Sequence, residues 1–144
     1  GLRQAHSTEI DEDTPEPVID ILPEQYDVED LGGTMRLGTH ETNIKPDTLA
    51  AALYEDDTCV ERHRHRYEVN PSYIDALTDA GMVFSGVSEN RMEILELLVH
   101  PFFIGTQFHP EFQSRPGRAS PPFIGLVDAM VDRASLETHQ EVQA

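Results

Sequence analysis

The chain has 144 residues, which suffices for one domain with a real core but hardly for two. Its 27 Asp and Glu residues outnumber its 10 Lys and Arg residues, so its formal net charge is −17 at pH 7. Such a chain repels nucleic acid and anionic membranes, and we expect neither as a partner. Because the acids are dispersed and Lys45 is the single lysine, we predict a surface that stays hydrated in high salt and a halophilic source.

The composition and the chain start also limit the compartment. Cys59 is the only cysteine, which excludes an internal disulfide and favours a reducing cytoplasm. No apolar run is long enough to span a bilayer. The start, Gly1-Leu2, is neither a signal peptide nor an initiating methionine, so we expect residue 1 to be an internal cut.

The first third of the chain predicts short elements between acidic loops. Residues 10–17 indicate a loop before a strand at Val18–Leu22, and residues 23–30 indicate a second loop. Two glycines in residues 31–38 then precede another strand. The alanine-rich stretch up to Tyr54, behind a capping Asp47, predicts a short helix.

The remaining elements alternate between strand and helix signals. Residues 58–69 predict one strand, which ends at Asn70-Pro71, and Asn70 and Pro71 then start a helix over 72–80 that Gly81 closes. Three apolar runs predict a β-meander feeding the sheet, and they cover 82–88, 92–99 and 102–108. A last helix opens at Ser120-Pro121-Pro122, and the polar tail 137–144 is expected to fray. The residues alone thus predict one α/β or α+β domain over 1–136.

The segment Gln107–Phe112 (QFHPEF) carries the first candidate site. His109 and Glu111 are two residues apart, and on an extended segment their side chains point to the same side. The carboxylate could then orient the imidazole as a general base, at the end of a strand where open α/β sheets bind ligands. A purely structural histidine remains an alternative, because such a dyad also needs a nucleophile.

Cys59 is a poor candidate for that nucleophile. Glu55, Asp56 and Asp57 precede it, and their negative charge would raise the pKa of its thiol. Nucleophiles of α/β enzymes usually occupy a sharp glycine-lined turn, and no glycine surrounds Cys59. We therefore interpret it as a structural thiol.

The run Arg62–Arg66 (RHRHR) is the densest positive segment. On a strand His63 and His65 share one face and the arginines share the other. Two histidines at this spacing can bind a metal, but the guanidinium groups oppose a cation, so we expect no metal. Two interpretations stay open, a surface strand whose arginines pair with Glu61 and Glu68, and a clamp for a carboxylate or phosphate.

Four segments, in order, resemble the C-terminal glutamine amidotransferase domain of the CTP synthase family. They are LGGTMRLG at 31–38, ERHRHRYEVN at 61–70, HPFF at 100–103, and QFHPEF followed by SRP at 107–116. The resemblance runs from about His6 to Leu126. It implies a class I glutamine amidotransferase-like (flavodoxin-like) three-layer α/β fold, of which this chain holds the C-terminal portion.

The resemblance also implies an activity. The family hydrolyses glutamine through a Cys-His-Glu triad and passes ammonia to a synthetase domain, a ligase of pyrimidine biosynthesis that uses ATP and Mg²⁺ to convert UTP to CTP. By resemblance, His109 is the general base, Glu111 its orienting carboxylate, and Glu9 and Arg66 bind glutamine. Arg36 is implied in an interdomain contact.

The implied partners are L-glutamine and the N-terminal synthetase domain of the same protein, in a homotetramer activated by GTP. No cofactor is implied in this chain itself. The family's nucleophilic cysteine lies upstream of the segment matching Ser7-Thr8-Glu9, and Cys59 does not match it. We therefore expect this fragment to be inactive alone and to expose a sheet edge and an apolar face.

Two alternative functions remain. One is a non-catalytic interaction module that kept the fold and lost the chemistry, and the other is a different class I glutamine amidotransferase. Metal binding at His63 and His65 is a weaker third alternative.

Overall fold

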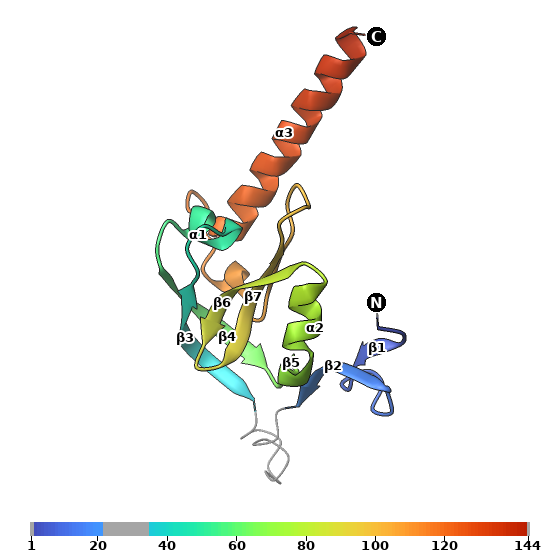
Figure 1. Cartoon of the computed structure of the whole chain (residues 1–144). Coiled ribbons are helices and arrows are strands. Elements are labelled where there is room, and N and C mark those ends of the chain that lie inside the picture. The colour runs from blue at the N-terminus through green and yellow to red at the C-terminus, as the bar shows by residue number, and fades with distance from the viewer. Residues whose placement is uncertain (1, 22–34, 144) are drawn as a thin grey trace.

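In the part of the chain that the structure describes, the strands form two sheets, and a long helix extends away from them (Figure 1). The computed structural model describes residues 2–21 and 35–143, with side chains described up to residue 136. The predicted loop 23–30, Leu22 and the first part of the glycine motif, 31–34, lie outside the described residues. One sheet has three strands in the order β1-β2-β5, and the other has five in the order β4-β3-β6-β7-β8.

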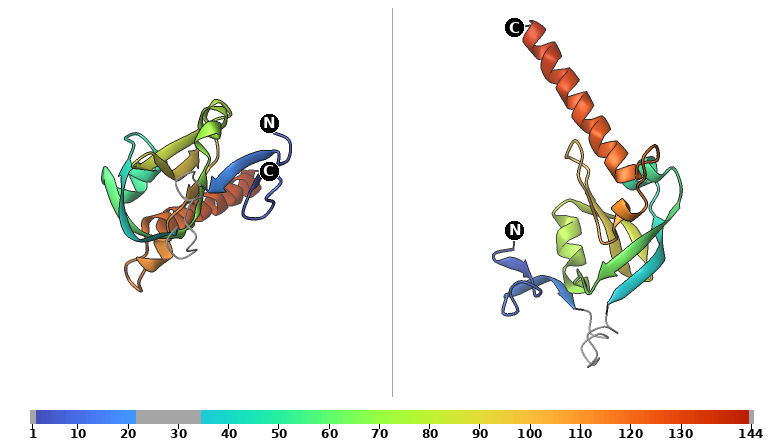
Figure 2. Two further views of the ribbon diagram at one scale, coloured as in Figure 1. Left: turned by 90° about the horizontal axis from the view of Figure 1, so that it is seen from below. Right: turned by 180° about the vertical axis from the view of Figure 1, so that it is seen from behind.

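The three-stranded sheet joins the start of the chain to its middle. Strands β1 (Ala5–Ser7) and β2 (Glu16–Ile21) are parallel, and β2 pairs antiparallel with β5 (Tyr67–Val69). The strand predicted from Val18 is thus confirmed, and it begins two residues earlier. This sheet lies at one side of the molecule, where β1 is an edge strand (Figures 1 and 2).

The five-stranded sheet is antiparallel throughout. Its strands are β3 (Arg36–Ile44), β4 (Thr58–His65), β6 (Met82–Ser88), β7 (Arg91–Leu97) and β8 (Ile104–Thr106). Strands β6, β7 and β8 form the predicted β-meander, which is confirmed. It continues the sheet that β3 and β4 begin.

The prediction of a single strand over 58–69 is wrong. The chain leaves β4 after His65 and enters β5 at Tyr67, so Arg66 is the one residue between two strands of different sheets. The local sequence has strand propensity on both sides of Arg66, but β4 pairs with β3 whereas β5 pairs with β2. Long-range pairing therefore decides where the strand ends.

Helix α1 (Leu49–Tyr54) is held by groups that the sequence did not indicate. The predicted cap Asp47 is wrong, because the Thr48 hydroxyl accepts the hydrogen bond from the Ala51 N–H at 3.2 Å. The buried carboxylate of Glu96 on β7 also accepts the N–H groups of Leu49 and Ala50, at 2.9 and 2.7 Å. An anion at these unpaired N–H groups stabilises the helix and fixes it to the sheet.

The predicted helix over 72–80 is confirmed as two pieces. A 3₁₀ turn at Pro71–Tyr73 precedes α2 (Ile74–Asp79), and the Asn70 side chain accepts the Ser72 N–H at 3.0 Å. Gly81 follows with φ +99°, a left-handed conformation that favours glycine.

The core cluster joins the five-stranded sheet to helix α1. Its buried members come from β3, α1, β4, β7 and the segment after β8, and they are Ile44, Ala50, Cys59, Ile94 and Phe108. Helix α3 (Pro121–Gln143) contacts this body near its start, where a Cβ on Gly125 would lie 2.4 Å from the Leu53 side chain. Gly125 therefore permits a close approach of α3 to α1.

Beyond that contact α3 projects from the body, as both views from front and back show (Figures 1 and 2). Four apolar side chains along α3 are 45–62% exposed, and they are Leu126, Val127, Met130 and Val131. Apolar side chains are thus exposed on α3, while the expected apolar face of an incomplete sheet and the fraying of the tail stay predictions. In the part of the chain that the structure describes, no helix is both long and apolar enough to cross a membrane.

Candidate active site

The His109 and Glu111 side chains are in direct contact. The Nδ1 atom of His109 lies 2.8 Å from Oε1 of Glu111, and both side chains are partly exposed, at 39% and 51%. The geometry that joins them differs from the expected one. Pro110–Phe112 form a 3₁₀ turn with His109 at its cap, so the turn, and not an extended strand, brings the two side chains together.

The backbone around His109 is fixed on both sides. The His109 N–H donates to the carbonyl oxygen of Arg62 on β4 at 2.9 Å, and Phe108 before it is buried in the core. The Arg62 guanidinium lies over the Phe112 ring, 5.5 Å from its centroid. The preceding strand β8 is a half-buried antiparallel edge strand, so the expected location at the end of a buried strand is wrong.

This contact determines which ring nitrogen of His109 can act as a base. A carboxylate only accepts hydrogen bonds, so the proton on neutral His109 lies on Nδ1 and the lone pair lies on Nε2. The pKa of Glu111 is lowered, first by a backbone hydrogen bond at Glu111 and then by His109, which keeps its carboxylate ionised at neutral pH. The pair is therefore chemically able to take a proton at Nε2 and to stabilise the resulting imidazolium.

Cys59 is buried in the core, with 6% of its surface exposed. Burial, followed by the charges of Glu61 and Glu93, raises the pKa of its thiol to about 12. The expected direction is thus confirmed, but the expected cause is wrong, because desolvation dominates and the acids involved are not Glu55, Asp56 and Asp57. At neutral pH this thiol is almost entirely protonated and a poor nucleophile.

Glu9 follows β1 and Arg66 precedes β5, and both strands belong to the three-stranded sheet. Glu9 is exposed in the turn after β1, where its N–H donates to the Ser7 hydroxyl at 3.2 Å, and Arg66 is half-buried between β4 and β5. Their neighbours Thr8 and Tyr67 both line a pocket of about 440 Å³. Neither Glu9 nor Arg66 lines this pocket itself, and neither do His109 and Glu111.

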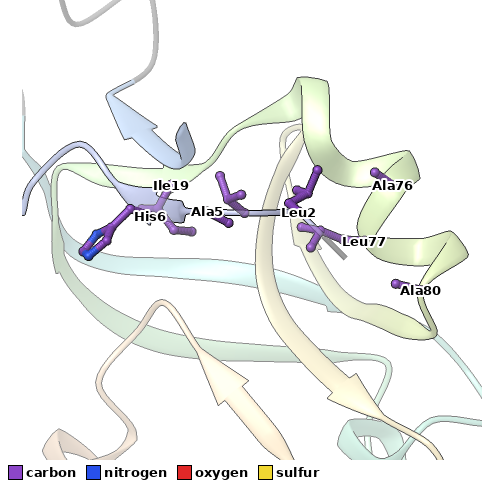
Figure 3. A pocket seen from close by; sticks show the side chains of 8 residues that line it. Leu2, Ala5, His6, Ile19, Ala76, Leu77 and Ala80 are labelled. Carbon is purple, nitrogen blue, oxygen red and sulfur yellow. The ribbon is translucent and has the colours of Figure 1, made fainter. Parts of the chain in front are cut away.

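A larger pocket, of about 680 Å³, lies between β1, β2 and α2. Figure 3 shows its mostly apolar side chains, among them Leu2, Ile19 and Leu77, with His6 at one end. Of the residues that line it, His6 is the only titratable one, so this pocket holds no acid and base pair.

A buried polar cluster, which we name the His–Glu network, lies beneath the break between β4 and β5. It consists of His63, His65 and Glu93, whose possible metal-ligating atoms lie within 4.8 Å of one another. Sequence reasoning missed Glu93, which is 1% exposed on β7.

Other groups already engage these ligand atoms. His63 Nδ1 and His65 Nε2 are 2.9 Å apart, and a guanidinium nitrogen of Arg36 lies 3.1 Å from Glu93. A cation already contacts the carboxylate, so the cluster fits a hydrogen-bonded network better than a metal site. The Arg36 side chain is also largely buried in this contact, which leaves little of it for the expected interdomain contact.

Comparison with known proteins identifies the class. The family model described as "Glutamine amidotransferase class-I" matches residues 3–129. The chain therefore belongs to the class I glutamine amidotransferase family.

Within this family, the chain resembles part of the CTP synthases. It is 67% identical over 140 residues to the CTP synthase of Natronomonas pharaonis and 57% identical over 143 residues to that of Archaeoglobus fulgidus. These matches cover 97% and 98% of this chain but 26% of each relative, so the chain spans about a quarter of their length. The halophilic relatives agree with the acidic composition.

A solved structure supports the same assignment of fold. The Trypanosoma brucei CTPS glutaminase domain with bound acivicin matches with a TM-score of 0.81 and 32% identity. The match covers 90% of this chain and 51% of that one. The expected class I glutamine amidotransferase fold, present as a portion, is confirmed.

Proposed function

We propose that this chain is the C-terminal part of the glutaminase domain of a CTP synthase, and that it contributes the base and part of the substrate site. The observation that carries the proposal is the 2.8 Å contact between His109 and Glu111, in a chain 67% identical to CTP synthases. The relatives that are called CTP synthases are nearly four times as long as this chain, so we assign the complete reaction to a larger protein.

In the proposed mechanism, His109 Nε2 takes the proton of a cysteine thiol from an upstream segment of the same domain. The thiolate attacks the carboxamide carbon of glutamine, and His109 then donates the proton to the leaving ammonia. A water molecule, deprotonated in turn by His109, releases glutamate from the acyl-enzyme. Glu111 holds the ring orientation and offsets the imidazolium charge throughout.

Glu9 and Arg66 are proposed to bind the two charged ends of glutamine. The carboxylate of Glu9 would meet the α-ammonium group, and the guanidinium of Arg66 would bind the α-carboxylate. Their sequence neighbours Thr8 and Tyr67 line one pocket, which supports a shared ligand. Fixing both ends of a zwitterion fixes the pose of its carboxamide.

The rest of the protein is proposed to use the ammonia. An N-terminal synthetase domain would bind ATP and Mg²⁺ and aminate UTP to CTP in the cytoplasm, as a homotetramer with GTP as activator. This chain would hold no cofactor. By itself it would be inactive, because its one thiol is buried and protonated.

The decisive experiment joins this chain to an upstream segment that carries a Gly-Cys-Leu-Gly elbow and measures glutamate release. We expect activity that falls by about 10³-fold with His109→Ala and about 10²-fold with Glu111→Ala. Glu9→Ala and Arg66→Ala should mainly raise KM for glutamine, by about tenfold or more. The exposed Glu55→Ala serves as the matched control and should leave both constants unchanged. Activity that survives both the His109 and the Glu111 substitution would refute the assigned roles.

The same experiment separates the alternatives. A non-catalytic interaction module would release no glutamate even when joined to the elbow, and the buried Cys59 is the observation that keeps this alternative open. A different class I glutamine amidotransferase would release glutamate but would not form CTP from UTP, ATP and glutamine in the complete protein.

A further inference from the structure

Arg66 occupies an unusual place in the backbone, since it is the single residue between the two sheets. β4 ends at His65 and belongs to the five-stranded sheet, whereas β5 begins at Tyr67 and belongs to the other. The direction of the Arg66 side chain therefore depends on how this break is held. In an uninterrupted strand, the regular alternation of side chains between the two faces would fix the direction of the Arg66 side chain.

We infer that the His–Glu network of His63, His65 and Glu93 positions Arg66 for glutamine, an inference that rests on the proposed function. These three are positioning residues, because they act through the backbone at the break and not on the substrate.

The first contact of the network holds the break itself. His65 Nδ1 lies 3.3 Å from the carbonyl oxygen of Tyr67, across Arg66. A carbonyl only accepts, so His65 must carry its proton on Nδ1 to make this bond. The ring thus bridges the residues on either side of Arg66 and fixes the local turn.

The second contact fixes the ring of His65. With its proton on Nδ1, neutral His65 has a lone pair on Nε2, and this atom lies 2.9 Å from Nδ1 of His63. His63 must therefore donate from Nδ1, so the bond to Tyr67 determines both tautomers in turn. Burial, with Arg36 in the case of His63, lowers the pKa of His63 to about 3 and of His65 to about 4, which keeps both rings neutral at pH 7.

The network ends on Glu93 and Arg36, which contact each other. Glu93 Oε2 lies 3.6 Å from His63 Nδ1, beyond hydrogen-bond distance. Arg36 lies 3.1 Å from the other oxygen of Glu93 and donates to the Ser88 hydroxyl at 3.1 Å. The chain of contacts thus ties the break to β3, β6 and β7, three strands whose own pairing is fixed.

The same strand sets the position of the base. The His63 ring packs edge-on against Phe108, with ring centroids 5.7 Å apart, and the next backbone N–H, that of His109, donates to Arg62. Arg66 lies four residues beyond Arg62, about 13 Å along an extended chain. Strand β4 therefore holds the backbone of His109 at Arg62, and Arg66 follows directly after the end of the same strand.

The test uses the complete protein, with this chain joined to its upstream residues, and measures kcat and KM for glutamine. His65→Leu places an apolar side chain of similar size in the same space but removes the donor to the Tyr67 carbonyl. We expect KM to rise at least tenfold while kcat changes by less than threefold. His65→Asn places an amide nitrogen where Nδ1 lay, and we expect it to restore KM to within threefold of the starting protein. Glu93→Gln should raise KM less, by about threefold.

His100 provides a matched control on the same chain. Its Nδ1 lies 2.8 Å from the carbonyl of Phe102, two residues on, which is the same contact in a loop outside the site. His100→Leu should leave KM unchanged. CTP formation from added ammonia bypasses glutamine and should stay unchanged in every variant, which shows that the synthetase part is intact.

The outcomes are distinct. A fall in melting temperature without a rise in KM for His65→Leu, or a failure of His65→Asn to restore KM, overturns the inference. Should the leucine variant not fold, nitrogen NMR of the unaltered complete domain decides, since a proton on Nε2 of His65 or His63 overturns it. Absence of glutamate release by the unaltered protein overturns the proposed function, and this inference with it.

Discussion

The five-stranded sheet buries charged side chains, whereas helix α3 exposes apolar ones. Inside the sheet, Glu61, Glu93 and Glu96 are 1–3% exposed, whereas Leu126, Val127 and other apolar side chains of α3 are 39–65% exposed. Folding normally buries apolar groups and leaves carboxylates in water. The two regions invert this rule for different reasons.

Each buried carboxylate in the sheet has a partner that offsets the cost of its burial. Glu96 accepts two N–H groups of α1, Glu93 pairs with Arg36, and Glu61 accepts the Tyr54 hydroxyl at 3.1 Å. The apolar face of α3 has no comparable cover in the part of the chain that the structure describes. The sheet is therefore locally complete, whereas α3 has the surface of a helix that packs against further residues of its domain.

The largest expected effect comes from changing that face. The matched glutaminase chain is about twice as long as this one. In a complete domain of that length, we expect residues outside this chain to cover α3. In the complete domain, Val127→Asp with Met130→Asp should cost about 3–6 kcal/mol of stability, because two buried apolar side chains become charged. Thermal and denaturant unfolding of the complete domain measure the loss.

The isolated 144-residue chain should respond in the opposite sense. Without a cover, the same two charges should reduce self-association, which sedimentation detects. Asp132→Asn, on the other side of the helix, is the control and should change neither quantity much. An unaltered stability of the complete domain would contradict the contrast between α3 and the sheet.

The buried charges of the sheet predict a smaller effect, visible in the pH dependence of stability. Burial raises the pKa of Glu93 to about 7, despite Arg36, so folded Glu93 keeps its proton between about pH 4.5 and 7 and its contribution to stability is lost as pH rises through 7. The pKa values of His63 and His65 are lowered, so their contribution is full above pH 6.5 and is lost as pH falls. The opposing effects partly cancel.

Removing Glu93 should expose the histidine effect. Between pH 6.5 and 4.5 the stability should fall as the pH falls, and Glu93→Gln should make this fall about twice as steep, because the opposing contribution of Glu93 is removed. The charges of six further residues also shift the pKa values of these groups, and they are Arg36, Arg91, Glu68, Glu89, His40 and His109. Denaturant unfolding of the complete domain at several pH values measures both slopes. Parallel curves would show that Glu93 is ionised in the folded domain.

The sequence predicted best where local signals decide. Asn70, Pro71 and Gly81 act on their own neighbours, and the helix they bound is found where expected. His109 and Glu111 are close enough along the chain that they meet in a 3₁₀ turn as they would have met on a strand. A short spacing therefore predicted the contact while the backbone conformation was wrong.

The His–Glu network could not be predicted, because it depends on pairing between distant strands. Glu93 and Glu96 are three residues apart on β7, which violates the alternation of a strand, yet both are buried. The register of β6 against β7 shifts near Gly86, and such an irregularity redirects side chains. The break at Arg66 likewise follows from β5 pairing with β2, far away in the sequence.

Substitution of Cys59 should have the smallest effect on activity, and it tests which thiol is the nucleophile. It lies in the same core cluster as Phe108, one residue before His109, so proximity alone makes it a rival nucleophile. Its environment argues against that role, because a pKa of about 12 leaves roughly one thiolate in 10⁴–10⁵ at pH 7 to 8. In the complete protein, Cys59→Ala should therefore keep glutaminase activity within about twofold and cost only about 1–2 kcal/mol for the small cavity.

Alkylation supplies the matching measurement on the unaltered chain. Iodoacetamide should leave Cys59 unmodified at pH 7.5 until the domain unfolds, whereas an activated upstream cysteine should react first and abolish activity. A more than tenfold loss of activity in a folded Cys59→Ala variant would make Cys59 the nucleophile. In that case the carboxylates Glu61 and Glu93 beside it would have to be protonated or displaced when glutamine binds, because their charge opposes a thiolate.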